Sequence, residues 1–229
     1  MAHYDFREFL CALEQKGLLL HVTCEVDRIG ELSQVMRWVY RGFPEEERFA
    51  VIFDNVKGFD IPVVVGAIGG SYKTYATGLG LDTSLSKPEV MQGIKRKWIE
   101  AMDHQILPIE VANPPCQEIV LRGNDINIHR LPIPVWTLEK DKGWDKGYGF
   151  MTSPYVITRD PETRIQNMGT YRGMTMAAPD EITIGTPPYQ HIGIHWSKYN
   201  SKNERMPIAV AIAAHPAVGM ASVTKIPYG

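Results

Sequence analysis

Apolar residues recur three or four positions apart in several stretches of the N-terminal half, a spacing that predicts amphipathic helices. The first stretch ends at Gly17, and glycine commonly terminates a helix. The last one carries the basic run KRK on the face opposite its apolar residues. The predicted helices span residues 4–16, 31–40 and 88–102.

Runs of β-branched and aliphatic residues alternate with these helices and predict strands. After a Pro-, Gly- and Asp-rich segment at 107–149, interpreted as a boundary with short strands, strand-like runs dominate. This pattern predicts an α/β (α+β) fold. The predicted strands are LLLHVTCEV (18–26), FAVIFDNV (49–56), IPVVVGAI (61–68), YVITRD (155–160), IQNMGTYRGM (165–174) and IAVAIAAH (208–215).

Composition narrows the class of protein. The chain has 229 residues, enough for one large or two modest domains, with 44% apolar and 22% charged residues. A net charge of -2 gives no electrostatic case for nucleic acid or an anionic membrane. Cys11, Cys24 and Cys116 form no CxxC motif, which favours a reducing compartment. The N-terminus MAHYDFREFL is not a secretory signal, and no apolar run could span a bilayer. We expect a soluble, cytoplasmic protein.

Two motifs are ambiguous. GAIGGSYKTYATGLG (66–80) follows a predicted strand as a phosphate loop would, but it lacks the GxxxxGK[ST] pattern. Its glycines are expected to serve turns and close packing. In TPPYQHIGIHWSKYN (186–200), Thr186 can cap a helix that begins at Pro187. His191 and His195 would then share one face, as paired metal ligands do. Alternatively, one of these histidines is buried and the other lies on the surface.

Two further motifs complete the set. RIQNMGTYRGM (164–174) follows the turn-like DPET and places the amide of Asn167 five residues before the cation Arg172. In IAVAIAAHPAVGMASVTKIP (208–227), a strand ends at His215 and small residues continue into a short helix over 217–222. Such a junction offers backbone N–H groups to an anion, or is a closely packed turn.

Taken in order, the motifs VITRDPET…QNMGTYR, PPYQHIGIHW and MPIAVAIAAHPAVGMAS resemble the UbiD-like family of reversible decarboxylases, which use prenylated FMN. The resemblance covers most of the chain. It implies an N-terminal α/β domain over 1–120 and a split β-barrel flavin-binding domain over 121–229.

The resemblance also implies roles for individual residues. Asn167 and His191 would bind a divalent metal, and Arg172 would face both the flavin and the substrate carboxylate as the catalytic residue. Ala221 and Ser222 would lie near the phosphate and a bound K⁺, whereas His195 has no assigned role and is expected to be structural. The implied flavin-contacting residues are Thr152, Gly169, Thr170, Tyr171, Arg172, Gln190, His191, Ala221 and Ser222.

The chemistry of these residue types agrees with such a site. A flavin phosphate needs counter-charge, and Mn²⁺ or Mg²⁺ held by an amide oxygen and an imidazole supplies it. The planar fork of Arg172 suits a carboxylate. The family implies an aromatic or α,β-unsaturated carboxylic acid substrate, CO₂ as the second partner, a flavin prenyltransferase as cofactor supplier, and a homo-oligomer.

One departure from the family pattern stands out. The family places a third metal ligand, a Glu, after a KIPYG-like segment, with its acid/base Glu residues and oligomerisation domain further on. This sequence ends at Gly229 and has no acidic residue after Glu204. We expect the front part of a longer enzyme, with weak metal binding, loosely held flavin and an exposed apolar edge that favours association. The alternative is an FMN-binding split-barrel module of the flavin reductase type without decarboxylase activity.

Overall fold

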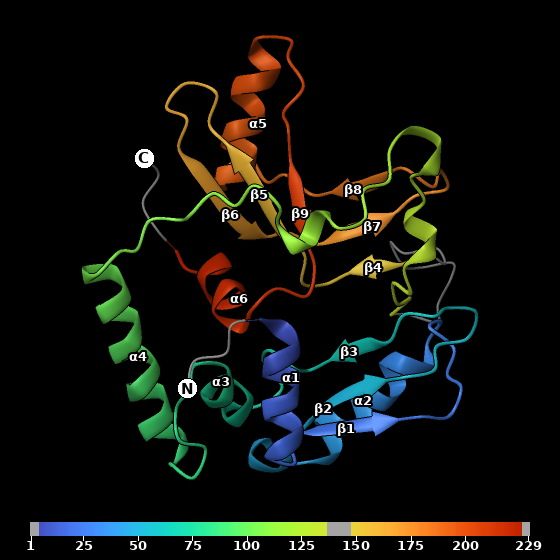
Figure 1. Cartoon of the computed structure of the whole chain (residues 1–229), viewed down its shortest axis with the longest axis vertical. Coiled ribbons are helices and arrows are strands. Elements are labelled where there is room, and N and C mark those ends of the chain that lie inside the picture. Colours follow the sequence, from blue (N-terminus) through green and yellow to red (C-terminus); the bar gives the residue numbers. More distant parts are fainter. Residues whose placement is uncertain (1–4, 137–147, 226–229) are drawn as a thin grey trace.

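The N-terminal half is a small mixed sheet between two helices (Figure 1). The computed structural model describes residues 5–136 and 148–225. Strand β1 (Leu19–Val22) is parallel to β2 (Ala50–Phe53), which is antiparallel to β3 (Val63–Val65). Successive residues of a strand point to opposite faces. Val51 and Phe53 therefore pack with helix α2 (Glu31–Gly42), whereas Ala50 packs with α1 (Phe6–Gln15).

The helices predicted from apolar periodicity are confirmed. Phe9 and Leu13 are the buried residues of α1, and Leu32, Met36 and Val39 are those of α2. The third predicted helix is α4 (Lys87–Asp103), which begins with a capping box between Ser86 and Glu89. The remaining helical elements of this half are α3 (Tyr72–Gly78) and the 3-10 turns η1 (Glu45–Glu47), η2 (Pro115–Gln117), η3 (Gly123–Asp125) and η4 (Ile128–Arg130).

The C-terminal half contains two antiparallel three-stranded sheets. One has the order β4-β7-β8 and the other β6-β5-β9. The chain passes from one sheet to the other three times, at 152–154, at 171–172 and between β8 and β9, where α5 lies. Within the described ranges the two sheets do not close into one barrel, so the split barrel stays a prediction. The strands are β4 (Phe150–Met151), β5 (Tyr155–Arg159), β6 (Gln166–Thr170), β7 (Gly173–Thr175), β8 (Ile182–Ile184) and β9 (Ala209–Ala211).

Two local predictions were wrong. The single strand predicted over 165–174 is divided at Tyr171 and Arg172, where the chain turns from β6 into β7 of the other sheet. The second error concerns α5, which spans His191–Ser201 and has Gln190 as its N-cap. It was expected to begin at Pro187, but a residue that precedes a proline is disfavoured in the helical conformation, and Pro188 follows.

Helix α6 (Pro216–Ser222) joins the two halves, and it confirms the short helix predicted there. It packs on α3 from one side and on β6 from the other. The approach to α3 is close, because a side chain at Gly78 would come within 2.7 Å of Pro216. The glycines of the 66–80 motif thus serve turns and close packing: Gly66 and Gly69 have φ of 81° and 88°.

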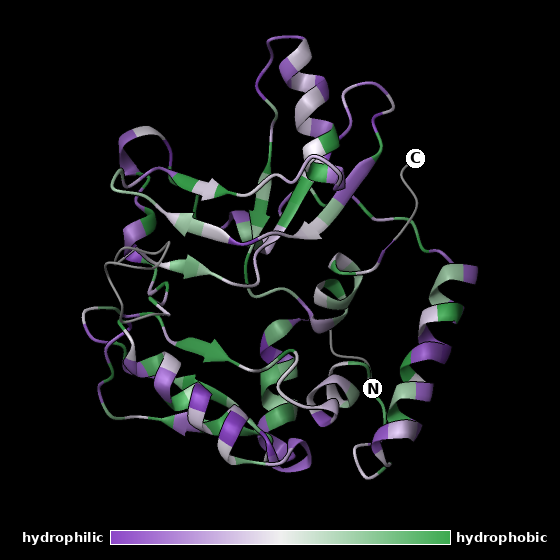
Figure 2. Ribbon diagram, turned by 180° about the vertical axis from the view of Figure 1, so that it is seen from behind, coloured by the Kyte–Doolittle hydropathy of each residue, from purple (hydrophilic) through white to green (hydrophobic). Residues whose placement is uncertain are grey.

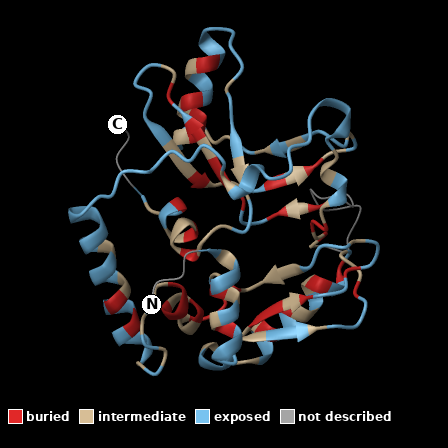
Figure 3. Ribbon diagram, in the orientation of Figure 1, coloured by how far each residue is buried: buried red, intermediate tan, exposed pale blue. Residues whose placement is uncertain are grey.

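Apolar side chains are exposed along α4 and the segment after it. Helix α4 lies at the edge of the molecule and is mostly exposed (Figures 1 and 3). Ile106, Leu107 and Ile109 follow it with exposed fractions of 92%, 83% and 87%. The described residues thus expose apolar side chains in the N-terminal half, and the apolar edge expected where a further domain would pack stays a prediction. No helix in the described part is long and apolar enough to cross a membrane. The segment 137–147, part of the predicted boundary, and residues 226–229, part of the KIPYG-like segment, lie outside the described residues.

Candidate functional site

The two proposed metal ligands lie in contact. Asn167 is in the middle of β6 and His191 is the first residue of α5, and both are half-buried. Asn167 Oδ1 is 2.8 Å from His191 Nδ1. Since an amide oxygen can only accept a hydrogen bond, the ring donates through Nδ1 in this arrangement. Two residues from separate motifs thus converge on one point.

The position of His191 depends on the loop that precedes α5. The backbone N–H of Gln190 donates to the carbonyl of Pro187 at 3.0 Å, which folds the Pro187–Pro188 segment back onto the helix. A side chain at Gly193 would come within 2.1 Å of that carbonyl oxygen. Only glycine permits so close an approach. The sequence analysis missed Gly193, although it lies within the QHIGIH motif.

The residues between Asn167 and Arg172 are closely packed against one another. A Cβ at Gly169 would lie 2.5 Å from the Tyr171 ring, so the ring covers the glycine closely. Arg172 is exposed, and its Cζ lies 5.9 Å from the centroid of the Phe150 ring, a cation–π contact. This contact holds the guanidinium at the corner between the two C-terminal sheets.

Thr170 connects the same strand to α6. Its hydroxyl is 2.6 Å from the hydroxyl of Ser222, which is buried and donates to the carbonyl of Gly219 at 2.7 Å. The neighbouring Ala221 is exposed. The structure therefore brings Thr170 together with Ser222, as it brings Asn167 together with His191.

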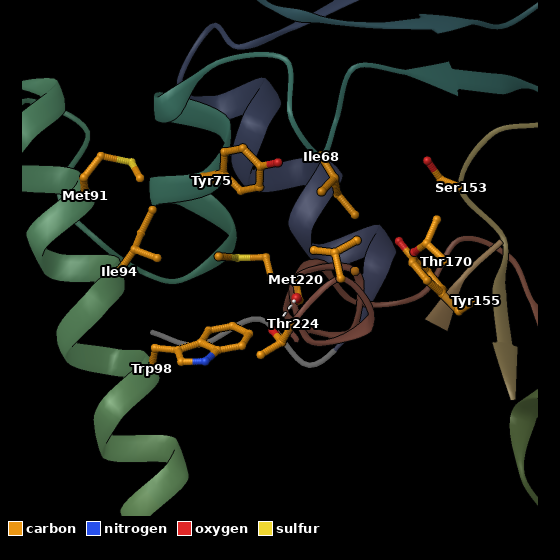
Figure 4. Close-up of a pocket in the computed structure, with 12 residues that line it drawn as sticks. Ile68, Tyr75, Met91, Ile94, Trp98, Ser153, Tyr155, Thr170, Met220 and Thr224 are labelled. Atoms are coloured by element: carbon orange, nitrogen blue, oxygen red, sulfur yellow. Dashed lines mark hydrogen bonds between the residues drawn. The ribbon is translucent and has the colours of Figure 1, made fainter. Parts of the chain in front are cut away.

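A cavity of about 580 Å³ lies beside Thr170 and α6 (Figure 4). Met91, Ile94 and Trp98 of α4 form one side of it, and Ser153 and Tyr155 lie on the far side. The lining is largely apolar. This fits the flat ring of an aromatic molecule better than a phosphate.

A second cavity of about 410 Å³ adjoins the first, since Ile68, Ser153 and Tyr155 line both. Thr152 and Phe150 line the second cavity, and Phe150 is also the ring that Arg172 contacts. Burial raises the pKa of Tyr155, which therefore stays a neutral phenol between the two cavities. Ser153 was missed from the sequence because it lies in the short link between β4 and β5, and Tyr155 because it fits an ordinary strand pattern.

Not every predicted site residue joins these groups. The residues that line the two cavities do not include Asn167, Arg172, Gln190 or His191. Gln190 is exposed at the N-cap of α5, next to His191. The predicted site residues thus form three groups. These are the polar pair Asn167 and His191, the segment that follows Asn167 along β6, and the residues that line the two cavities.

The polar pair offers two possible ligand atoms that lie close together. Asn167 Oδ1 and His191 Nδ1 are 2.8 Å apart in a hydrogen bond, so metal binding through Nδ1 would require this nitrogen to lose its proton. An oxygen and an imidazole nitrogen also suit Mn²⁺ or Mg²⁺. Within residues 5–136 and 148–225, no group of three or more His, Cys, Asp or Glu side chains is placed to hold a metal. A metal here would depend on further ligands, such as phosphate and water.

Comparison with known proteins places the chain in a family. The model described as the 3-octaprenyl-4-hydroxybenzoate carboxy-lyase Rift-related domain matches residues 109–229. The model for the N-terminal domain of the same carboxy-lyase matches residues 10–93. The chain therefore belongs to the UbiD family.

Solved structures agree with this assignment. Vanillic acid decarboxylase of Sedimentibacter hydroxybenzoicus in its closed form is 30% identical over 97% of this chain, with a TM-score of 0.85. The UbiD-class enzyme HmfF of Pelotomaculum thermopropionicum, in complex with FMN, is 27% identical over 93% of this chain, with a TM-score of 0.76. Apo 3,4-dihydroxybenzoic acid decarboxylase of Klebsiella pneumoniae, at 22% identity over 98% of this chain and a TM-score of 0.81, shares the fold.

These matches cover only part of the similar structures. The chain spans 45% of the Sedimentibacter enzyme, 43% of the Pelotomaculum enzyme and 45% of the Klebsiella enzyme. It therefore corresponds to less than half of the length of each.

Proposed function

We propose that this chain forms the flavin- and metal-binding part of a UbiD-type carboxy-lyase. The enzyme would act on an aromatic or α,β-unsaturated carboxylic acid with prenylated FMN, releasing or fixing CO₂. The observation that carries the proposal is the contact between Asn167 and His191, because two motifs 24 residues apart converge there at 2.8 Å. Membership of the UbiD family and the FMN and prenylated-FMN complexes of the similar HmfF enzyme support the choice of cofactor.

In this proposal Asn167 and His191 hold a divalent ion, Mn²⁺ or Mg²⁺, which neutralises the flavin phosphate. Prenylated FMN, when bound, supplies the electron sink for the loss of CO₂. Gly169, Thr170 and Tyr171 line the flavin along β6, together with Thr152 and Gln190. Ala221 and Ser222 lie near the phosphate and a bound K⁺.

Arg172 is the proposed catalytic residue. Its guanidinium would bind both oxygens of the substrate carboxylate and hold the acid against the flavin. Two facts support this role: Arg172 is exposed, and its Cζ lies 5.9 Å from the ring centroid of Phe150, which lines the second cavity.

The remaining assignments follow from the family. We propose an N-terminal α/β domain over 1–120 and a split β-barrel flavin domain over 121–229. The whole enzyme would be a cytoplasmic homo-oligomer that receives its cofactor from a flavin prenyltransferase. The alternative, a flavin reductase-like module without decarboxylase activity, is not favoured, because the matching family models and structures are of the UbiD class.

The metal pair can be tested directly on the chain. FMN is titrated into the wild type with and without Mn²⁺, and binding is followed by flavin fluorescence. We expect binding to tighten when Mn²⁺ is present, and Asn167→Ala to abolish that gain. Asn200→Ala, which changes an exposed asparagine near the end of α5, is the matched control and should retain it. Equally tight, metal-independent binding by the wild type and Asn167→Ala would overturn the proposed site.

A further inference from the structure

Helix α5 rests on the sheet β6-β5-β9 through three polar contacts spaced along one helical face. Their helix residues are His191, His195 and Lys198, at positions i, i+4 and i+7. His191 contacts Asn167 of β6, as described above. The His195 ring nitrogen Nδ1 is 2.9 Å from the hydroxyl of Thr158. Lys198 donates to the carboxylate of Asp160 at 2.7 Å.

The partners on the sheet are also aligned. Thr158 of β5 is paired directly with Asn167 of β6 in the antiparallel register. Side chains of directly opposite residues lie on the same face, with Cβ atoms about 4.5–5.5 Å apart. Asp160 follows two residues after Thr158, just beyond the end of β5. The Thr158–His195 contact is therefore the neighbour of the Asn167–His191 contact on both the strand pair and the helix.

The Thr158–His195 and Asp160–Lys198 contacts involve more deeply buried residues than the Asn167–His191 contact does. Thr158 and Asp160 are 1% exposed and His195 is 2% exposed, whereas Asn167 and His191 are half-buried. A buried polar group is costly unless it is hydrogen-bonded. Rotation of α5 by one residue, about 100°, would separate all of these groups from their partners. Hydrogen bonds constrain the helix more tightly than apolar contacts do, because they depend on the direction as well as the distance between the groups.

We infer that Thr158 and His195 are positioning residues for the metal site. They hold α5 at the rotation and height at which the His191 ring meets the amide of Asn167. The Asp160–Lys198 pair fixes the same helix one turn further on. This inference rests on the proposed metal-binding role of Asn167 and His191.

The electrostatics of His195 are compatible with this role. Burial lowers the pKa of the imidazole, so His195 is neutral at neutral pH. A neutral ring one turn from His191 adds no positive charge beside a site that is to bind a cation. A lysine or arginine at the same place would hold the helix but repel the metal.

The experiment compares substitutions that remove a hydrogen bond with substitutions that keep it. Thr158→Val retains the shape of the side chain but loses the hydroxyl, whereas Thr158→Ser keeps the hydroxyl. The readout is Mn²⁺ affinity, measured by electron paramagnetic resonance on the whole chain with saturating FMN. Loss of a residue that orients a metal ligand typically weakens metal affinity about 10–100-fold. We expect a loss in that range for Thr158→Val and near wild-type affinity for Thr158→Ser.

A matched control separates positioning from stability. Thr175 is also buried in a strand, where its hydroxyl accepts from the backbone N–H of Gly149, but this contact lies away from α5. Thr175→Val should lower the melting temperature while leaving Mn²⁺ affinity unchanged. A purely structural role for Thr158 would give the two valine variants the same pattern.

The outcomes are distinguishable. If the wild type binds no Mn²⁺ with FMN, the proposed metal site fails and the inference falls with it. If the wild type binds and Thr158→Val binds equally well, the inference alone is overturned. Should Thr158→Val not fold, His195→Leu and His195→Asn replace it. The asparagine amide can reach the position of Nδ1 and should preserve affinity, whereas leucine should not, and equal affinity in the two would overturn the inference.

Discussion

Helices α2 and α5 each cover a three-stranded sheet, but α2 buries an apolar stripe, whereas α5 combines buried Ile192 and Tyr199 with polar pairs to the sheet. Leu32, Met36 and Val39 of α2 are at most 2% exposed and pack on Val51 and Phe53 of β2. Figure 2 shows the polar outer side of this helix, which makes α2 an ordinary amphipathic element.

Helix α5 is built differently. Figure 3 marks buried residues at intervals along it, and His195 is among them. The contacts of α5 to β5 and β6 include three polar pairs made by His191, His195 and Lys198. Apolar packing stabilises a helix without fixing its rotation precisely, whereas hydrogen bonds are directional. The difference separates a helix whose task is to cover a core from one that must present a side chain at a fixed point.

The largest expected effect on the free energy of unfolding concerns α2, the helix that packs through apolar residues. Leu32→Ala should lower the free energy of unfolding by about 2–5 kcal/mol, because it removes transfer energy and leaves a cavity. Arg37→Ala, at an exposed position of the same helix, should change it by less than about 0.5 kcal/mol. Urea unfolding measures both. Equal losses would show that the α2 interface does not depend on its apolar face.

An intermediate effect is expected for the outermost polar pair of α5. Lys198→Met should cost about 1–3 kcal/mol, because the carboxylate of Asp160 is only 2% exposed and loses its cation. Asp160 keeps the backbone N–H donors of Glu162 and Thr163, which limits the loss.

The matched control for this pair is Lys202→Met. Lys202 lies 3.8 Å from Glu162, and both side chains are well exposed. Such an exposed pair contributes little to stability. If urea unfolding gave the same loss for Lys198→Met as for Lys202→Met, the buried pair would have no special importance for α5.

The smallest effect concerns pH. Burial lowers the pKa of His195 below its ordinary 6.5; Asp160 opposes this change, and His191 and Lys198 reinforce it. The unfolded chain therefore binds a proton at His195 before the folded chain does. The neutral His195 ring makes its full contribution to the free energy of unfolding above about pH 6.5. This contribution is lost as the pH falls through the lowered pKa of the folded state.

This dependence is measured by urea unfolding at a series of pH values between about 7.5 and 5.5, a range that brackets the ordinary pKa of a histidine side chain. His195→Asn, which does not titrate, is the reference. We expect the wild type to lose stability more steeply than the variant on acidification. Parallel curves would mean that His195 is protonated equally in both states.

The sequence predicted the separate elements of the fold well. Helical periodicity located α1, α2 and α4 to within a few residues, since each has a clear apolar face and a stop or cap nearby. It did not locate the start of α5, because the Pro187–Pro188 loop, and not the apolar pattern, sets it. It also missed the division of 165–174, because both strands carry the same residue types.

For the candidate site, the motifs named Asn167 and His191, but nothing in their spacing required them to meet. The residues that were not singled out from the sequence, such as Thr158, Ser153 and Gly193, look like ordinary strand, loop or helix positions. Their importance comes from neighbours that are remote along the chain. His195 lies 37 residues from Thr158, and its contact exists only after β5 has paired with β6 and α5 has docked.

The amino-acid sequence by itself thus determined which segments are helical, which are extended, and which motifs carry the family's chemistry. Helix periodicity and capping depend on residues within one turn of each other, so a local pattern is sufficient to encode them. The tertiary structure alone decided which polar groups meet. The register of β5 against β6 and the rotation of α5 are set by packing across the whole domain, and a shift of one residue in either would turn the same side chains away from each other.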